Sequence, residues 1–270
     1  MRISCGELIS ETRKSSLYNF HTHTQFCDGK ATMKEFVEEA VKRDFKALGF
    51  SPHSPIPFES PCNMTLEDVD NYFTHIDILR KENPGIKIFA GMEVDYLGEE
   101  WGAHNKYFAS LPLDFTISSI HFIPAQDGTP VDIDGRFEQF RVKMEQFFHN
   151  DIRYVVDTYM QHTHQMLDSG GFEIIGHFDK IALNGSLFYP ELESTQWFNQ
   201  GIRDIIDHIA SKEYIVEINT KAFEKHGRFF PHRRWWDVLK TRNIPLIVNS
   251  DAHYPELLDA SRLLPLDFTG

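Results

Sequence analysis

The stretch YNFHTHTQFCDG, residues 18–29, decides how the rest of the chain is interpreted. It begins as a short apolar strand and ends in two histidines separated by one residue. Because side chains two residues apart on a strand point to the same face, His21 and His23 can direct both imidazoles at one point beyond the strand end. Neutral imidazole is a common ligand of zinc-like metals, and Asp28 in the following loop can add a carboxylate oxygen. We therefore expect a metal site at this strand end.

The composition is that of an ordinary globular protein, with 41% of the 270 residues hydrophobic and 25% charged. This length fits one large α/β barrel as well as two small domains. A net charge of −13 argues against a general nucleic-acid or membrane-surface binder, which would usually be basic. Three cysteines without framework spacing indicate reduced thiols and a cytoplasmic location. Residues 1–16 contain no apolar secretory segment, and no apolar run approaches membrane-spanning length.

Apolar runs of strand length alternate with segments of helical periodicity along the chain. We predict seven strands, at residues 18–20, 47–50, 86–92, 115–120, 172–176, 214–219 and 244–250. We predict helices at residues 32–43, 65–82, 135–167 with a break near 150–151, 195–211 and 235–241. This alternation favours parallel strands with right-handed crossovers, in one domain over residues 1–270. The expected fold is an α/β barrel, with an open doubly wound sheet as the alternative.

Side chains of metal-ligand type end six of the seven predicted strands, where an α/β barrel places its chemistry. Histidines scattered through a core would not recur at the C-terminal ends of successive strands. Nine donors are more than one zinc ion accepts, so they suit two or three metal ions that share carboxylates. Two such ions can hold a bridging hydroxide and bind a phosphoryl group. The candidate ligands are His21, His23, Asp28, His53, Glu93, His121, His177, Asp251 and His253.

The motifs around these residues resemble those of the PHP (polymerase and histidinol phosphatase) superfamily, and within it the histidinol-phosphate phosphatases. The resembling segments, in family order, are residues 21–23, 28–29, 49–53, 91–93, 119–121, 175–177, 217–220 and 250–253. The resemblance implies a distorted (β/α)7 TIM-like barrel with a trinuclear centre of zinc, manganese or iron. It also implies hydrolysis of L-histidinol phosphate, a step of histidine biosynthesis, by a metal-bridging hydroxide.

The resemblance further implies which candidate ligands bind which metal ion. The first metal would be bound by His21, His23, Glu93 and Asp251, the second by Glu93, His121 and His177, and the third by Asp28, His53 and His253. Some relatives have a histidine where this chain has Asp28, and the harder carboxylate favours iron or manganese over zinc. The catalytic residues implied are Glu93, Asp251 and His253, of which Asp251 or His253 would assist the leaving alkoxide.

The loop after the sixth predicted strand carries positive charge in an otherwise acidic chain. Arginine and lysine are suited to holding phosphate, and the candidates on this expected active face are Lys221, Lys225 and Arg228. We expect Glu217 to orient neighbouring groups rather than to bind metal. His162 and His164 repeat the His-x-His spacing, but they lie in a helical stretch where residues two apart do not share a face. We therefore expect them on the surface.

Other functions remain open alongside this one. A phosphodiesterase or nuclease of the same superfamily, or a phosphatase for another small phosphomonoester, would use the same metal site. A metal-dependent amidohydrolase would usually bridge its metals with a carboxylated lysine, whereas Glu93 stands at the bridging position here. A non-catalytic domain of the same fold would be expected to have lost ligands. We expect a small phosphorylated substrate as the partner and neither nucleic acid nor a membrane; the sequence does not indicate an oligomeric state.

Overall fold

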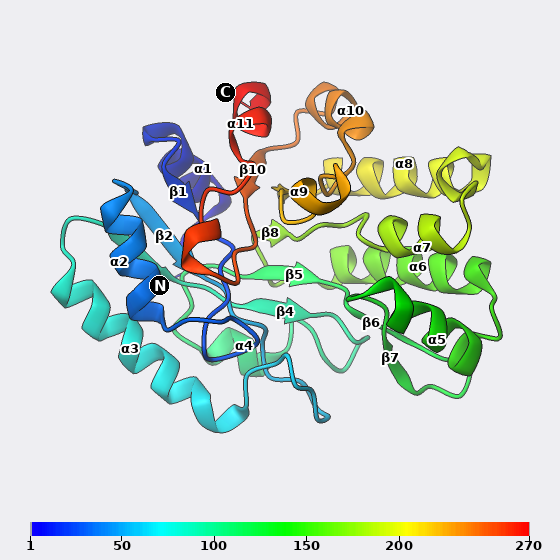
Figure 1. Ribbon diagram of the computed structural model, residues 1–270, viewed down its shortest axis with the longest axis horizontal. Helices are drawn as coiled ribbons and strands as arrows, with labels where there is room; N and C mark the ends of the chain where they lie inside the picture. The colour runs from blue at the N-terminus through cyan, green and yellow to red at the C-terminus, as the bar shows by residue number, and fades with distance from the viewer. Residues whose placement is uncertain (1, 270) are drawn as a thin grey trace.

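The computed structural model describes residues 2–269 and places parallel strands at the centre, with helices outside them (Figure 1). Two parallel sheets have the strand orders β1-β2-β3 and β10-β9-β8-β5-β4, and β6 pairs with β7 in an antiparallel hairpin. The strands are β1 (Tyr18–Asn19), β2 (Ala47–Phe50), β3 (Lys87–Ala90), β4 (Glu93–Asp95), β5 (Ile117–Ser119), β6 (Phe122–Pro124), β7 (Pro130–Asp132), β8 (Ile174–Ile175), β9 (Ile215–Asn219) and β10 (Leu246–Asn249).

Two isolated bridges connect the parallel sheets into a distorted (β/α)7 barrel. Thr22, beyond β1, pairs with Ala252, beyond β10, and the His23 N–H donates to the Ala252 carbonyl at 2.9 Å. On the opposite side, His53 beyond β2 pairs with Glu93 at the start of β4. Counting β3 and β4 as one position, the order around the barrel is β1, β2, β3/β4, β5, β8, β9 and β10. The predicted α/β barrel is confirmed.

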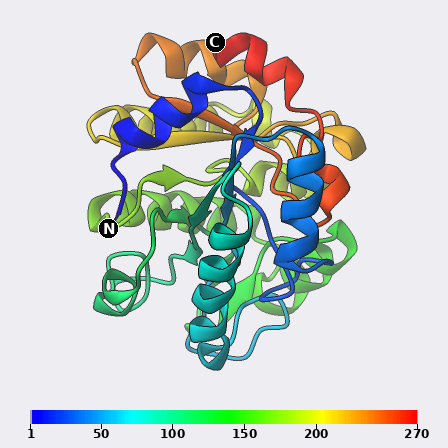
Figure 2. The same cartoon turned by 90° about the vertical axis from the view of Figure 1, so that its left-hand side faces the viewer.

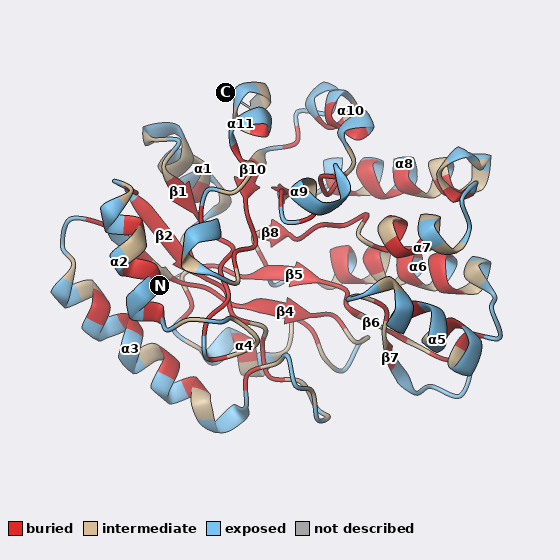
Figure 3. Ribbon diagram, viewed as in Figure 1, coloured by how far each residue is buried: buried red, intermediate tan, exposed pale blue. Residues whose placement is uncertain are grey.

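The helices surround the strands with their apolar faces turned inward, as the burial colours of Figure 3 show. The outer helices are α2 (Met33–Lys42), α3 (Val69–Glu82), α4 (Lys106–Ser110), α5 (Phe137–Phe148), α6 (Ile152–Ser169), α7 (Ile181–Phe188), α8 (Gln196–Ala210), α9 (Phe223–His226) and α10 (Trp236–Thr241). Four 3-10 turns are η1 (Leu66–Asp68), η2 (Leu192–Ser194), η3 (Arg233–Trp235) and η4 (Pro255–Leu257). Among residues 2–269, no helix is long and apolar enough to cross a membrane.

Helix α1 (Cys5–Lys14) covers the end of the barrel at which the strands begin. Its Leu8 packs into a buried cluster to which β1, β5, β8, β9 and β10 each contribute an aromatic or branched aliphatic side chain. That cluster consists of Leu8, Tyr18, Phe20, Ala47, Phe115, Ile117, Ile174, Ile215 and Ile247. Figures 1 and 2 show α1 beside the C-terminal helix α11 (Leu263–Thr269), whose Leu266 packs against the same cluster. Apolar side chains thus fill one end of the barrel, and polar groups can gather only at the other end.

Most predicted elements are confirmed, and the predicted strand at residues 86–92 is the main correction. It divides into β3, which pairs with β2, and β4, which pairs with β5. The change of partner occurs at Gly91, where an added Cβ would lie 2.2 Å from the ring of Phe115. The break near residues 150–151 is confirmed, because His149 and Asn150 have left-handed φ angles of 51° and 61°. The sequence did not predict α1, α4, α7, α9, α11 or the β6–β7 hairpin.

Candidate metal centre

All nine predicted ligands lie together at the end of the barrel toward which the parallel strands point. Seven of them follow a strand where the chain turns from the buried sheet into a loop, Glu93 begins β4, and Asp28 lies in the loop after β1. His21 and His23 extend β1 on one face, as their spacing predicted, with rings 5.1 Å apart between centroids. The remaining strand-end residues are His53 after β2, Glu93 at the start of β4, His121 after β5, His177 after β8, and Asp251 and His253 after β10.

Glu93 occupies the middle of the group and is 1% exposed. Its Oε2 lies 3.2 Å from His21 Nε2, 3.5 Å from His23 Nε2 and 3.1 Å from His53 Nδ1. Its Oε1 lies 3.0 Å from His177 Nε2 and 3.7 Å from His121 Nε2. The two oxygens of one carboxylate thus face two different sets of histidines, which is the arrangement of a ligand shared by two metal ions.

Two further carboxylates, Asp251 and the loop residue Asp28, lie close to histidines of the same group, including His253. Asp251 Oδ1 lies 3.1 Å from His23 Nε2 and 3.8 Å from His21 Nε2. Asp28 Oδ1 lies 3.2 Å from His253 Nε2 and 3.9 Å from His53 Nε2. Within the described chain, ligand atoms converge to within 4.8 Å in four groups: His21/His23/Asp251, His21/Glu93/His177, His23/Asp28/His53/His253 and His53/Asp95/His121.

Several of these buried atoms have no hydrogen-bond partner in the protein, which tests whether the residues fit a metal. The unpaired atoms are Nε2 of His21, His23 and His121, Nδ1 of His53, Oε2 of Glu93 and Oδ1 of Asp28. Leaving one buried polar atom unsatisfied costs about 1–3 kcal/mol, so such a set is retained only where a ligand compensates for it. Imidazole nitrogens together with carboxylate oxygens are the donors that zinc, iron and manganese accept. The residues therefore fit divalent metal ions.

Two buried carboxylates hold histidines in the tautomer that a metal needs. His21 Nδ1 lies 2.7 Å from Glu217 Oε1, and His121 Nδ1 lies 2.7 Å from Asp95 Oδ1. When Nδ1 carries the proton and donates it to the carboxylate, the lone pair of Nε2 points at the cluster. Glu217 has the orienting position that its sequence context suggested. Asp95 was not predicted, although its i+2 spacing from Glu93 placed both side chains on one face of the strand.

The protonation of the cluster is set by burial and by its carboxylates. Burial lowers the pKa of His53 to about 4, so its imidazole is neutral near pH 7 and can bind a metal. Burial would also lower the pKa of His121, but the carboxylates of Asp95 and Glu93 outweigh it and raise the pKa to about 9. A metal that binds His121 must therefore displace a proton, which makes binding favourable at higher pH.

Comparison with known proteins agrees with this geometry. The family model described as the PHP domain matches residues 19–221, about three quarters of the chain and most of the metal cluster. The chain belongs to the PHP family. The histidinol-phosphatase of Bacillus subtilis is 25% identical over 255 residues, which cover 86% of this chain and 92% of that protein. The histidinol-phosphatase of Lactococcus lactis is 26% identical over 212 residues, covering 77% of this chain and 72% of that protein.

Two solved structures share the fold of this PHP chain. The "putative histidinol phosphatase hisK" of Listeria monocytogenes superimposes with a TM-score of 0.79 at 21% identity and covers 90% of this chain and 98% of its own. Histidinol phosphate phosphatase from Lactococcus lactis, crystallised with zinc, L-histidinol and phosphate, has a TM-score of 0.62 at 22% identity. It covers 88% of this chain and 86% of its own. Both show that this chain shares the fold of these two proteins.

The cluster of the PHP chain opens into a cavity of about 840 Å³. Its wall includes the ligands Asp28, His53, His121, Asp251 and His253. Aromatic side chains on the wall are Phe122, Phe230 and Tyr254, and the carboxylates besides the ligands include Glu59, Asp132, Asp134 and Glu224. A cavity of this size can hold a small organic molecule.

Of the three predicted phosphate contacts, two line this cavity. Lys221 Nζ lies 3.1 Å from Asp251 Oδ1, and Lys225 is on the cavity wall. Arg228 is a correction: it is 8% exposed and absent from the cavity wall, and its guanidinium pairs with Glu193 at 2.6 Å and Asp179 at 3.3 Å. Since both carboxylates already hold this side chain inside the fold, it does not reach a substrate.

The other histidines singled out in the sequence lie away from the metal centre. His162 and His164 are on α6, as the helical spacing predicted, and both are half-buried rather than on an open surface. His164 Nδ1 lies 2.8 Å from Nδ1 of His208 on α8, and their rings stack. This pair joins two outer helices and contributes nothing to the cluster.

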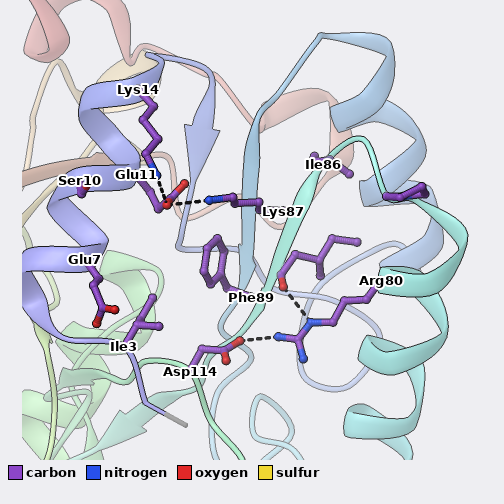
Figure 4. Close-up of a pocket in the computed structure, with 12 residues that line it drawn as sticks. Ile3, Glu7, Ser10, Glu11, Lys14, Arg80, Ile86, Lys87, Phe89 and Asp114 are labelled. Atoms are coloured by element: carbon purple, nitrogen blue, oxygen red, sulfur yellow. Dashed lines mark hydrogen bonds and ion pairs between the residues drawn. The ribbon is translucent and has the colours of Figure 1, made fainter.

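A second cleft, of about 650 Å³, lies near the starts of β3 and β5, between α1 and α3 (Figure 4). Its charges are paired with one another: Glu11 accepts from Lys14 at 2.6 Å and Lys87 at 2.8 Å, and Arg80 contacts Asp114. The metal-ligand groups found in the described chain all lie elsewhere, at the strand ends. These groups lie at the end of the barrel opposite this cleft.

Proposed function

We propose that this protein is a metal-dependent phosphomonoesterase that hydrolyses L-histidinol phosphate to L-histidinol and inorganic phosphate, a step of histidine biosynthesis. The observation that carries the proposal is the convergence of nine ligands, Glu93 among them, with unpaired nitrogen and oxygen atoms aimed at one another. We infer two or three ions of zinc, manganese or iron, divided as the family resemblance implies. The three cysteines are free thiols, which fits action in the cytoplasm.

When bound, the divalent ions supply a hydroxide nucleophile near neutral pH and neutralise the phosphate oxygens. The oxygen of water forms a bond to phosphorus as the ester P–O bond breaks, and the leaving alkoxide takes up a proton. We infer that Asp251 or His253 assists the leaving alkoxide, because both lie on the cavity wall, with side chains 2% and 13% exposed. Lys221 holds its ammonium 3.2 Å from His253 Nε2, where it can bind a phosphate oxygen.

The choice of substrate rests on the relatives and on the cavity. Two matching proteins carry the name histidinol-phosphatase, and one solved neighbour contains L-histidinol and phosphate. Carboxylates and lysines both line the cavity, which suits a substrate with both a phosphate and a cationic organic part. The net charge of −13 opposes a polynucleotide substrate and so disfavours a nuclease.

Phosphate release from a panel of esters tests the proposal. Metal-stripped protein is reconstituted separately with zinc, manganese and iron, and L-histidinol phosphate is compared with other phosphomonoesters and with bis(4-nitrophenyl) phosphate. We expect metal-dependent release that is fastest from L-histidinol phosphate. Comparable slow release from many monoesters would remove the substrate assignment, and turnover of the diester alone would indicate a phosphodiesterase. Absence of release with all three metals would indicate a non-catalytic domain.

A further inference from the structure

An ion pair that the mechanism above does not use lies on the wall of the same cavity. Lys180 Nζ is 2.7 Å from Asp134 Oδ2, and the two side chains are 13% and 34% exposed. Lys180 directly precedes α7, and Asp134 follows β7, so the pair joins two segments far apart in the chain. Figure 1 shows β7 and α7 on the side to which the arrows of β4 and β5 point, which is the side of the metal cluster.

The surrounding structure fixes both members of this pair. The Ile133 N–H donates to the His121 carbonyl at 2.9 Å, and the buried Asn184 of α7 donates to the Ile133 carbonyl at 3.4 Å. On the other side, Asp179 next to Lys180 accepts from Arg228 and from the His232 N–H at 2.8 Å. Hydrogen bonds of the neighbouring residues therefore hold the backbone at Lys180 and at Asp134. The positions of the ammonium and the carboxylate do not depend on their contact with each other alone.

The position of Lys180 relative to the ligands is what indicates a role in binding. Lys180 lines the same cavity as the ligands His121 and Asp251. Burial would lower the pKa of its ammonium, but the carboxylates of Asp134, Asp251 and Glu93 raise it, and the last two belong to the metal cluster. Once divalent ions occupy the cluster they neutralise these carboxylates, and Lys180 then faces cations with Asp134 as its remaining counter-ion. A phosphate dianion supplies the missing negative charge. A partly exposed ion pair contributes little to stability, so its retention here calls for another explanation.

We propose that Lys180 binds the substrate phosphate and that Asp134 binds an ammonium group of the same substrate, so that the pair selects phosphate esters of 2-amino alcohols. An ammonium has three donors and a carboxylate two acceptor oxygens, so each partner can bind substrate while keeping the other. Because their heads lie 2.7 Å apart, the groups they bind must be close neighbours in the substrate. In a 2-amino alcohol the amine and the phosphate ester are on adjacent carbons. L-Histidinol phosphate is such an ester, so this inference rests on the proposed function and assigns residues to it.

Binding of two non-hydrolysable phosphonates tests the pair independently of turnover. 3-Aminopropylphosphonate has the spacing of a 2-aminoethyl phosphate, and propylphosphonate is the same molecule without the amine. Calorimetry on metal-loaded protein compares the wild type with Lys180→Met, Asp134→Asn and Lys143→Met. Lys143 of α5 is the matched control, because it forms a 2.7 Å ion pair with Asp132 of β7, two residues before Asp134, but is not itself on the cavity wall. Metal content of each variant is measured by mass spectrometry.

We expect Lys180→Met to weaken binding of both phosphonates about 10-fold or more, as loss of a charge-assisted hydrogen bond does. Asp134→Asn should abolish the wild-type preference for the amine and change the affinity for propylphosphonate less than about threefold. Lys143→Met should leave both affinities within about threefold of the wild type. Unchanged affinities in Lys180→Met, or an amine preference that survives Asp134→Asn, would overturn the inference.

The two proposals fail separately. If the reconstituted protein does not hydrolyse L-histidinol phosphate, the proposed function is lost, while the calorimetric comparison still decides the roles of Lys180 and Asp134. If hydrolysis is found and the phosphonate affinities are the same in all four proteins, the phosphatase stands and the recognition pair is wrong. An equal loss for both phosphonates in Asp134→Asn would mean that Asp134 only positions Lys180, and would also refute its role toward the amine.

Discussion

Glu217→Gln should weaken metal binding even though Glu217 is not placed as a ligand. This carboxylate is fully buried, and its Oε1 lies 2.7 Å from His21 Nδ1 and accepts from Asn249 Nδ2 at 2.9 Å. Its Oε2 accepts from Asn219 Nδ2 at 3.1 Å. Glutamine keeps the shape but replaces one oxygen by an amide nitrogen that donates. In either orientation this nitrogen faces groups that donate to the wild-type carboxylate, so at least one hydrogen bond is lost.

The orientation that places the amide nitrogen against His21 has the larger consequence. His21 can then avoid two facing donors only by moving its proton from Nδ1 to Nε2, which removes the lone pair aimed at Glu93 and Asp251. Loss of an orienting partner of a metal-bound histidine typically costs about 10–100-fold in metal affinity, equivalent to about 1.4–2.7 kcal/mol. Loss of a hydrogen bond to a charged group costs about 1.5–3 kcal/mol, so the two estimates agree.

The assay is a titration of metal-stripped protein with zinc at buffered free concentrations, with bound metal counted by mass spectrometry. We expect the binding curve of Glu217→Gln to move to about 10–100-fold higher free zinc for the ion held by His21. Asp95→Asn should shift the ion held by His121 instead. Glu173→Gln is the control, because that carboxylate accepts from the Thr116 N–H at the opposite end of the strands. A Glu217→Gln curve that superimposes on those of the wild type and the control would refute the reasoning.

Three shorter predictions follow from the same structure. Chelation should abolish phosphate release and lower the thermal midpoint, and added zinc or manganese should restore both; a midpoint unmoved by chelation would contradict metal-linked folding. Burial would raise the pKa of Glu193, but pairing with Arg228 holds it below the usual 4.5. The pair therefore stabilises the folded state above pH 4.5, and this stabilisation is lost as pH falls through the lower pKa of folded Glu193. The free energy of unfolding, measured in denaturant between pH 3 and 6, should therefore depend less on pH in Glu193→Gln than in the wild type. Parallel plots of this free energy against pH for the two proteins would exclude the prediction. Gly91→Ala should destabilise by about 1–3 kcal/mol through contact with Phe115, and Phe115→Leu in the same chain should recover part of the loss if the clash is the cause.

The sequence was sufficient for the barrel and for the assembly of the cluster because both depend on short-range patterns. The alternation of strands and helices predicts parallel pairing, and residues that end parallel strands must meet at one edge of the sheet. His21 and His23 needed only the period of a strand to be placed correctly. The distances of 3.1–3.5 Å that join them to Asp251 and Glu93 follow from that register.

Arg228 shows where such reasoning stops. Its neighbours in sequence made it look like one of three phosphate contacts, but its partners Asp179 and Glu193 lie 49 and 35 residues away in the chain. Lys180 was overlooked for the opposite reason, since nothing near it in sequence marks it as facing the cavity. Both side chains are charged, and only the packing of loops after different strands decides which one reaches the cavity.

The break between β3 and β4 explains why one glutamate can serve two sides of the site. Up to Ala90 the chain pairs with β2, and from Glu93 onward it pairs with β5. Glu93 thus begins a strand at the junction of the two sheets. Its Oε2 faces histidines that follow β1 and β2, whereas its Oε1 faces histidines that follow β5 and β8. Glu93 also bridges to His53 beyond β2, so its backbone lies between the two sheets. This position gives the shared carboxylate access to both sets of ligands.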